Sequence, residues 1–307
     1  MSLLAVATTP VWAERYRLPP GFDQSRLAEM ERELKVASPE ISARNANDRR
    51  PRVYYKLLYA PQRGDAVTLM GANGQKVAAQ YDLGSLFKGV VGQSARFRLF
   101  DAGQGSGVED VTTIYLHGQI VEVRQNIVDN LRLRQVVTEV KMRVILRETA
   151  SGEDKYQKVV SGIWGDDPNE GTIIPPGVPI ADAGVQQNLV SDYQQALRIA
   201  LKQAAEYVEE IYRPVGRVLG VEGEHVKLYG GGAHGFHAGD RVIIFRAKLP
   251  PGVERLDLAM RIPLGEVECM PDAGSTSDCT VQGMNPNSEF QAGDYAILRK
   301  GAKQEEK

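Results

Sequence analysis

Three short stretches carry residue types that could bind a metal ion or a phosphate. His234 and His237 stand three apart in "AHGFH", but zinc hydrolases place such a pair on a helix with a glutamate base. The stretch Ala102–Gly107, "AGQGSG", is typical of a phosphate loop, yet a strand pattern follows it where a helix N-terminus is needed. The acidic stretch Gly165–Gly171 lacks the alternating ligands of a calcium loop. We therefore predict no catalytic residue, no cofactor and no metal site, and a protein that is not an enzyme.

A nine-residue stretch occurs twice near the C-terminus, as "FHAGDRVII" and "FQAGDYAIL". Each copy contains a Gly-Asp pair, Gly239-Asp240 and Gly293-Asp294, directly before an apolar run. Glycine permits a positive φ, and aspartate can accept a hydrogen bond from nearby backbone. We interpret both pairs as structural turns that direct a strand into a core. The alternative is a catalytic pair formed by Asp240 and Asp294.

The two cysteines, Cys269 and Cys279, lie in short strand patterns separated by the turn sequence Pro271–Gly274. Antiparallel strands joined in this way would place the cysteines side by side. We predict a disulfide in an oxidising compartment, which would stabilise the fold by about 2–3 kcal/mol. In the cytosol the same residues would be two buried thiols.

The middle of the chain has the pattern of an α+β domain. Arg52 starts a β-rich stretch, Lys76–Gly92 has helical spacing, and strand patterns follow at Arg96–Ala102 and Ile114–Arg124. Arg134–Arg147 alternates apolar and charged residues, as a half-buried strand of an antiparallel sheet does, and Lys155–Ile163 is its hairpin partner. The basic residues of that strand, Lys141, Arg143 and Arg147, indicate a solvated face rather than a nucleic-acid site.

A long irregular loop and a long helix complete this domain. The loop, residues 164–183, is rich in Gly, Pro and Asp, and loops of this length are often functional. We predict that Trp164, Asp166 and Asp167 form an exposed interaction loop. Apolar residues then recur at helical spacing from Val185 to Ile211, with Asp182 as the N-cap.

The remaining segments give the domain organisation. Six short strand patterns between residues 214 and 300 predict a small β-barrel. Residues 14–51 are a polar arm and linker with one helical stretch near Ser25–Lys35, either a mobile arm or a docking helix, and residues 301–307 are a charged tail. The predicted fold class is α+β: residues 52–213 form a sheet with helices on one face, and the small all-β barrel follows.

Composition and the N-terminus bear on compartment. The chain has 307 residues and a net charge of −2, which gives no argument for binding nucleic acid or an anionic membrane. No apolar run is long enough for a transmembrane span. Residues 1–13 end in Val11-Trp12-Ala13, small residues in the arrangement of an export-signal cleavage site, although a basic n-region is missing. A mildly apolar N-terminus with no signal function is the alternative.

Two resemblances follow from particular residues. The strand with Phe97, Leu99 and Asp101, followed by Gly118, Ile120 and Glu122, resembles the curli-channel-subunit family and the related Tol-type fold over about residues 52–213. The C-terminal part resembles the barrel of the T protein of the flagellar H-ring. The matching residues are Val218, Val221, Val226, Leu228, Gly235, Gly239, Asp240, Gly293 and Asp294. The flagellar protein also has a Tol-like domain before its barrel. This chain lacks the N-terminal cysteine of curli-type lipoproteins.

These resemblances imply a periplasmic, non-enzymatic assembly or scaffold protein of the bacterial envelope, free or associated with the outer membrane. The leading hypothesis is a flagellar outer-ring or motor accessory component. The alternative is a regulatory binding module for a cell-wall synthase or an outer-membrane secretion channel. Its partners would be other envelope proteins, and a ring-forming homo-oligomer is one arrangement that the flagellar resemblance implies.

Overall fold

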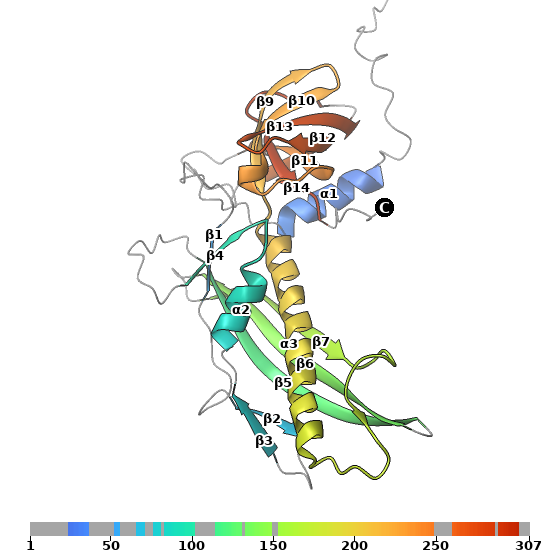
Figure 1. Cartoon of the computed structure of the whole chain (residues 1–307). Helices are drawn as coiled ribbons and strands as arrows, with labels where there is room; N and C mark the ends of the chain where they lie inside the picture. The colour runs from blue at the N-terminus through green and yellow to red at the C-terminus, as the bar shows by residue number, and fades with distance from the viewer. Residues whose placement is uncertain are drawn as a thin grey trace, which may run out of the picture. The chain divides into compact units, whose positions relative to one another are not determined.

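The computed structural model describes residues 24–36, 52–55, 66–70, 76–80, 83–101, 114–130, 133–148, 153–248, 260–285 and 288–300. The predicted export segment, the linker Ser42–Pro51, the stretch Ala102–Gly107 and the charged tail lie outside these residues. The chain divides into two compact units (Figure 1). The sheet unit comprises mainly Arg50–Tyr212, and the barrel unit comprises the N-terminal helix together with Arg213–Lys307.

The sheet unit is a mixed β-sheet with helices on one face, as the sequence predicts. Its elements are β1 (Arg52–Tyr55), β2 (Ala66–Met70), β3 (Lys76–Gln80), α2 (Leu83–Val91), β4 (Arg98–Asp101), β5 (Ile114–Asn130), β6 (Leu133–Glu148), β7 (Asp154–Trp164), β8 (Ile173–Ile174) and α3 (Ala183–Ile211). The strand order is β4-β1-β5-β6-β7, and β8 pairs with the start of β6. Strand β1 runs parallel to β4 and β5, whereas β5, β6 and β7 are antiparallel.

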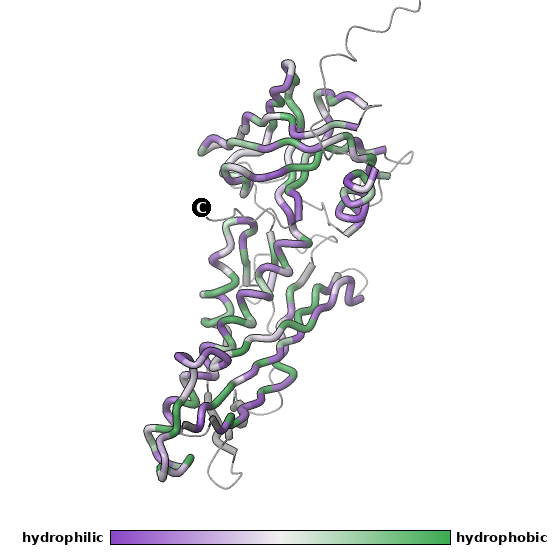
Figure 2. The backbone as a smooth tube through the Cα atoms, turned by 90° about the vertical axis from the view of Figure 1, so that its right-hand side faces the viewer, coloured by the Kyte–Doolittle hydropathy of each residue, from purple (hydrophilic) through white to green (hydrophobic). Residues whose placement is uncertain are grey.

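Helix α3 supplies a large share of the core of this unit. Its buried residues recur every three or four positions and pack on the inner faces of the strands (Figures 1 and 2). The carboxylate of Asp182 accepts hydrogen bonds from the backbone N–H groups of Gly184 and Val185, at 2.9 and 3.3 Å, which confirms the predicted N-cap. The helix lies so close to β7 that a Cβ added to Gly162 would stand 1.9 Å from the carbonyl oxygen of Ala196.

One predicted element is partly wrong. The helical spacing of Lys76–Gly92 predicts one helix, but the first part is strand β3, and the helix α2 begins at Leu83. Strand β3 pairs antiparallel with β2 in a separate two-stranded sheet. A stronger local signal stands between the two strands: Asn73-Gly74 between two apolar runs is typical of a β-hairpin.

The barrel unit contains a closed six-stranded barrel, which confirms the six predicted strands. They are β9 (Val215–Glu222), β10 (His225–Tyr229), β11 (Asp240–Lys248), β12 (Met260–Pro271), β13 (Thr276–Met284) and β14 (Tyr295–Leu298). Their order around the barrel is β10-β13-β12-β11-β14-β9, and every neighbouring pair is antiparallel. Alternate residues fill the interior, among them Val226, Leu228, Val242 and Ile244.

Candidate protein-interaction site

The repeated Gly-Asp pairs form two turns of the same kind in the barrel. Gly239 and Gly293 have φ angles of +79° and +95°, the left-handed region that favours glycine. Asp240 donates its N–H to the carbonyl of His237, and its carboxylate accepts the N–H of His237 at 2.7 Å. Asp294 makes the same two bonds with Gln291, the second at 2.8 Å. Each aspartate therefore closes its own turn, as the structural interpretation predicts.

The two aspartates do not form one site. Asp240 is the first residue of β11, whereas Asp294 precedes β14 and lies near Arg246, at the other end of β11. The guanidinium of Arg246 makes two hydrogen bonds of 2.8 Å to the Asp294 carboxylate. Asp294 thus holds a turn and an ion pair, and Asp240 holds a turn.

The predicted disulfide is confirmed. Cys269 and Cys279 are directly opposed on β12 and β13, with Cα atoms 4.1 Å apart, and their sulfur atoms are bonded. Both side chains are buried in the barrel interior. The bond joins neighbouring strands within the core and closes a loop between positions only ten apart, so it restricts the unfolded chain less than a long-range cross-link would.

The first histidine of the pair, His234, is packed into the barrel unit. His234 is buried, and its ring meets that of Tyr229 edge-on at 5.2 Å between centroids. Its Nδ1 accepts the backbone N–H of Gly231. Within the part of the chain that the structure describes, no three His, Cys, Asp or Glu side chains stand together as metal ligands would.

The predicted interaction loop is held firmly against the sheet unit. Its first residue, Trp164, is half-buried rather than exposed, because its ring packs on the core of the sheet unit. Asp166 and Asp167 are exposed. The side-chain amide of Gln135 lies 2.7–3.0 Å from three loop carbonyls, those of Gly165, Asp167 and Glu170. The loop therefore presents its acids from a fixed backbone.

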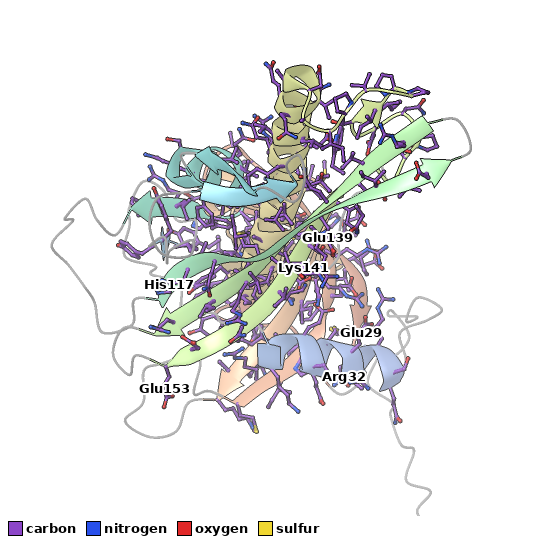
Figure 3. The ribbon with its side chains drawn as sticks, turned by 90° about the horizontal axis from the view of Figure 1, so that it is seen from below. Glu29, Arg32, His117, Glu139, Lys141 and Glu153 are labelled. Atoms are coloured by element: carbon purple, nitrogen blue, oxygen red, sulfur yellow. A yellow bond between two sulfur atoms is a disulfide. The ribbon has the colours of Figure 1, made fainter. Side chains whose placement is uncertain are left out.

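Two of the three basic residues that form the stripe on β6, Lys141 and Arg147, are paired with acids. Lys141 lies 3.1 Å from Glu122 and 3.6 Å from Glu139, and Glu139 and Lys141 stand near each other on the hairpin (Figure 3). The hydrogen bond from Lys141 is the main cause that lowers the pKa of Glu122. Arg147 pairs with Asp154 at 2.7 Å. Lys141 and Arg147 are thus paired across the sheet face, whereas the Nε atom of Arg143 is buried without a hydrogen-bond partner among the residues that the structure describes.

Helix α1 (Gln24–Val36) packs on the outside of the barrel, so the docking-helix alternative is the correct one. Met30 and Leu34 are buried against three outward-facing barrel residues, Ile243, Phe245 and Ile297. These three belong to a cluster separate from the barrel interior. Strands β11 and β14 are therefore apolar on both faces, one for the interior and one for α1.

Ion pairs surround this apolar contact. Glu266, on β12, has no exposed surface and accepts hydrogen bonds from Arg26 of α1 at 2.8 and 3.1 Å and from Arg299 at 3.0 and 3.2 Å. Glu33 of α1 accepts from Arg213 at 2.8 Å, and Arg299 also reaches Glu29 at 2.7 Å. Glu29 is labelled on α1 in Figure 3.

Arg213 and Arg299 are held in place by these ion pairs. Arg213 is only 2% exposed, and it donates to the carbonyl of Leu298 as well as to Glu33. Burial alone would lower the pKa of Arg299, but Glu266, Glu29 and Glu33 outweigh it, so the pKa lies above its ordinary value. Glu33 further accepts the backbone N–H of Lys300 at 2.6 Å. We call this surface the α1-binding face: Arg213, Ile243, Phe245, Glu266, Ile297 and Arg299.

Sequence reasoning identified the helix and its stripe but not the face that receives it. Leu27, Met30 and Leu34 carry a local signal because they recur every three or four residues. The partners of Glu29, Glu33 and Arg26 lie 180–270 positions away in the chain. Ile243, Phe245 and Ile297 did carry a signal, since an apolar residue at every position of a barrel strand indicates that both faces are covered.

Comparisons with known proteins give little further information. No protein-family model and no curated protein matches the chain. Similar solved structures include a minor lipoprotein from Acinetobacter baumannii, with 12% identity, 51% of this chain and 86% of that chain covered, and a TM-score of 0.28. A protein from Xanthomonas campestris has 9% identity, 51% and 82% coverage and a TM-score of 0.32. A hypothetical protein from Chlamydia trachomatis has 13% identity, 50% and 98% coverage and a TM-score of 0.24.

At these TM-scores the likeness carries no argument about fold or function, so the resemblances to the curli-type and flagellar families stay predictions. Within the described ranges, no helix has both the length and the apolar character needed to cross a membrane.

Proposed function

We propose that this protein is a non-enzymatic assembly or scaffold protein of the bacterial envelope that works in the periplasm. The observation that carries the proposal is the α1-binding face. An apolar patch ringed by buried, paired charges is the composition of a helix-binding surface, in which apolar residues provide contact area and charges fix the register.

The compartment is supported by the disulfide. Cys269 and Cys279 are bonded in the barrel core, and structural disulfides persist in oxidising compartments such as the periplasm. The cleavage-site pattern at Val11–Ala13 points to the same compartment.

The finer proposal is a flagellar outer-ring or motor accessory component. It is supported by the order of the two units, an α+β sheet followed by a closed barrel, which is the order in the flagellar protein that the C-terminal residues resemble. The exposed acids Asp166 and Asp167 would serve contacts with other envelope proteins.

The test is a deletion strain complemented with the wild-type chain or with a loop variant, Asp166→Asn/Asp167→Asn. We expect the deletion to impair swimming, the wild-type chain to fractionate with flagellar basal bodies, and the loop variant to be released from them. The exposed Glu153→Gln is the matched control, because it removes one acid outside the loop.

Two results would contradict parts of the proposal separately. Normal swimming, with the protein found instead with cell-wall synthases or a secretion channel, would overturn the flagellar role and favour the regulatory alternative. Reduced Cys269 and Cys279 in thiol trapping of intact cells would overturn the periplasmic placement itself.

A further inference from the structure

The contact between α1 and the barrel is made by side chains far apart in the sequence. Arg26 and Glu266 are 240 positions apart, Glu33 and Arg213 are 180 apart, and Glu29 and Arg299 are 270 apart. None of these pairs requires a particular path of the chain between them. The contact therefore depends on the two surfaces and not on the path of the chain that connects them.

We propose that the α1-binding face also accepts α1 of a second copy, so that copies of this chain join head to tail by exchanging the helix. This proposal rests on the assembly function proposed above, because it names a second copy as one of the partners. Such exchange is heterologous, since the helix of one copy meets the barrel of the next, and it leads to rings when the rotation closes.

The two surfaces are complementary in charge. Three charged residues of α1 take part in the contact: Arg26 is positive, and Glu29 and Glu33 are negative. Their charges sum to −1. Three charged residues of the barrel unit face them: Glu266 is negative, and Arg213 and Arg299 are positive. Their charges sum to +1. Arg26 is matched to a glutamate and both acids are matched to arginines, so the charges fix the register of the helix on the barrel. Every copy of the chain carries that helix.

The helix also has the properties of an exchangeable element. It has 13 residues, and helices of this length are marginal in isolation, so its order comes from the surface on which it docks. Fifteen residues, 37 to 51, separate it from β1, and a chain of that length can reach about 50 Å. The same contacts then form within one chain or between two, and the balance depends on the effective concentration of the helix at its own barrel.

Exchange should therefore be rare in dilute solution and favoured where copies are held side by side. To measure it without competition from a chain's own helix, we would combine two full-length variants. Met30→Asp/Leu34→Asp disables the helix and leaves the α1-binding face intact. Arg299→Glu disables that face, because the new carboxylate meets Glu29, Glu33 and Glu266, and leaves the helix intact.

Each variant alone should be monomeric by light scattering, and an equimolar mixture in the micromolar range should contain a complex with the mass of two chains. The complex contains only two chains, because the mixture offers one functional helix on one variant and one functional face on the other. A chain carrying all three substitutions is the control, and its mixture with either variant should stay monomeric. Thermal melting and an intact disulfide check that each barrel is folded.

A mixture that stays monomeric while all variants are folded would overturn helix exchange. So would a complex that the triple variant forms equally well with the helix-disabled chain, because that contact would not use α1. Neither result affects the envelope function, which is tested by motility, fractionation and thiol trapping.

Discussion

Two helices of this protein dock on β-structure by opposite means. Helix α3 has 29 residues, and its apolar stripe reaches the sheet so closely that Gly162 must lack a side chain. Helix α1 has 13 residues, buries Met30 and Leu34, and is surrounded by paired arginines and glutamates. The first contact is a domain core; the second resembles an interface between proteins.

The difference suggests different roles. A helix that carries so large a share of a core cannot leave without unfolding its unit, because its departure exposes a continuous apolar surface. A short helix held at a few apolar points by specific ion pairs can leave or be replaced while the barrel keeps its own interior. Four predictions test this contrast, from the largest expected change in the free energy of unfolding to the smallest.

Gly162→Ala should be severely destabilising for the sheet unit. The new Cβ would lie 1.9 Å from the carbonyl oxygen of Ala196 and 2.5 Å from the N atom of Ala200, so α3 must move off the sheet. We expect a loss of about 3 kcal/mol or more, measured by urea unfolding. The control is Gly89→Ala in α2, where the Cβ meets nothing within 4 Å and should be neutral or slightly stabilising. Equal stability of the two variants would show that the close approach is not real.

Removing the disulfide should affect the barrel unit and spare the sheet unit. Cys269→Ala/Cys279→Ala loses a cross-link between positions ten apart in the chain, and we expect a loss of about 2–3 kcal/mol. Thermal melting would measure the loss of stability. Hydrogen exchange would show that the barrel amides become less protected. If amides of α3 lost protection to the same extent, the two units would not be independent in stability.

Leu34→Ala should release α1 and leave the barrel folded. Leu34 is buried against the outer barrel cluster, and its truncation should weaken docking by about 2 kcal/mol. Hydrogen exchange should show faster exchange in residues 24–36 with unchanged protection in the strands that line the barrel interior. Glu31→Ala, at an exposed position of the same helix, is the control. Global unfolding by Leu34→Ala would place α1 in the core of the barrel and contradict the contrast with α3.

The smallest effect concerns Asp192, a buried carboxylate on α3. Burial raises its pKa, against the opposing hydrogen bonds from Thr172 and Trp164. A carboxyl with a raised pKa in the folded state contributes stability that is present below its unfolded pKa and lost as pH rises through the folded pKa. The wild type should therefore lose about 1 kcal/mol or less relative to Asp192→Asn as the pH rises from about 4 to 7. If the wild type instead gained stability relative to Asp192→Asn as the pH rises, the folded protein would favour the charged form of Asp192.

Local patterns in the sequence predicted most of what is local in the fold. The alternation in β6, the stripe and cap of α3, the six barrel strands and the turns at Gly239 and Gly293 each depend on neighbours within a few positions. The disulfide was predictable because one short turn joins the two strands. Strand β3 was missed because its short apolar run fits a helix equally well, and pairing with β2 decided the outcome.

The candidate site was predictable only in part, for a physical reason. A stripe on α1 shows that the helix docks, and the apolar run at Ile243 and Phe245 indicates a covered barrel face, but no local pattern connects the two. The connection is made by Arg213, Glu266 and Arg299, whose charges have no periodic signal and become meaningful when the fold brings them together. Trp164 was expected at the surface because its loop is polar, whereas its ring packs on the core that α3 and the strands form.

The claim that the outer face of the barrel recognises α1 can be tested with a fluorescent peptide of residues 22–38 and the full-length chain carrying Met30→Asp/Leu34→Asp. Fluorescence anisotropy should show saturable one-to-one binding. A peptide with Glu33→Gln should bind about tenfold more weakly or worse, because Arg213 would keep its buried charge and lose its carboxylate. Absence of saturable binding, or equal binding of a scrambled peptide of the same composition, would contradict the account.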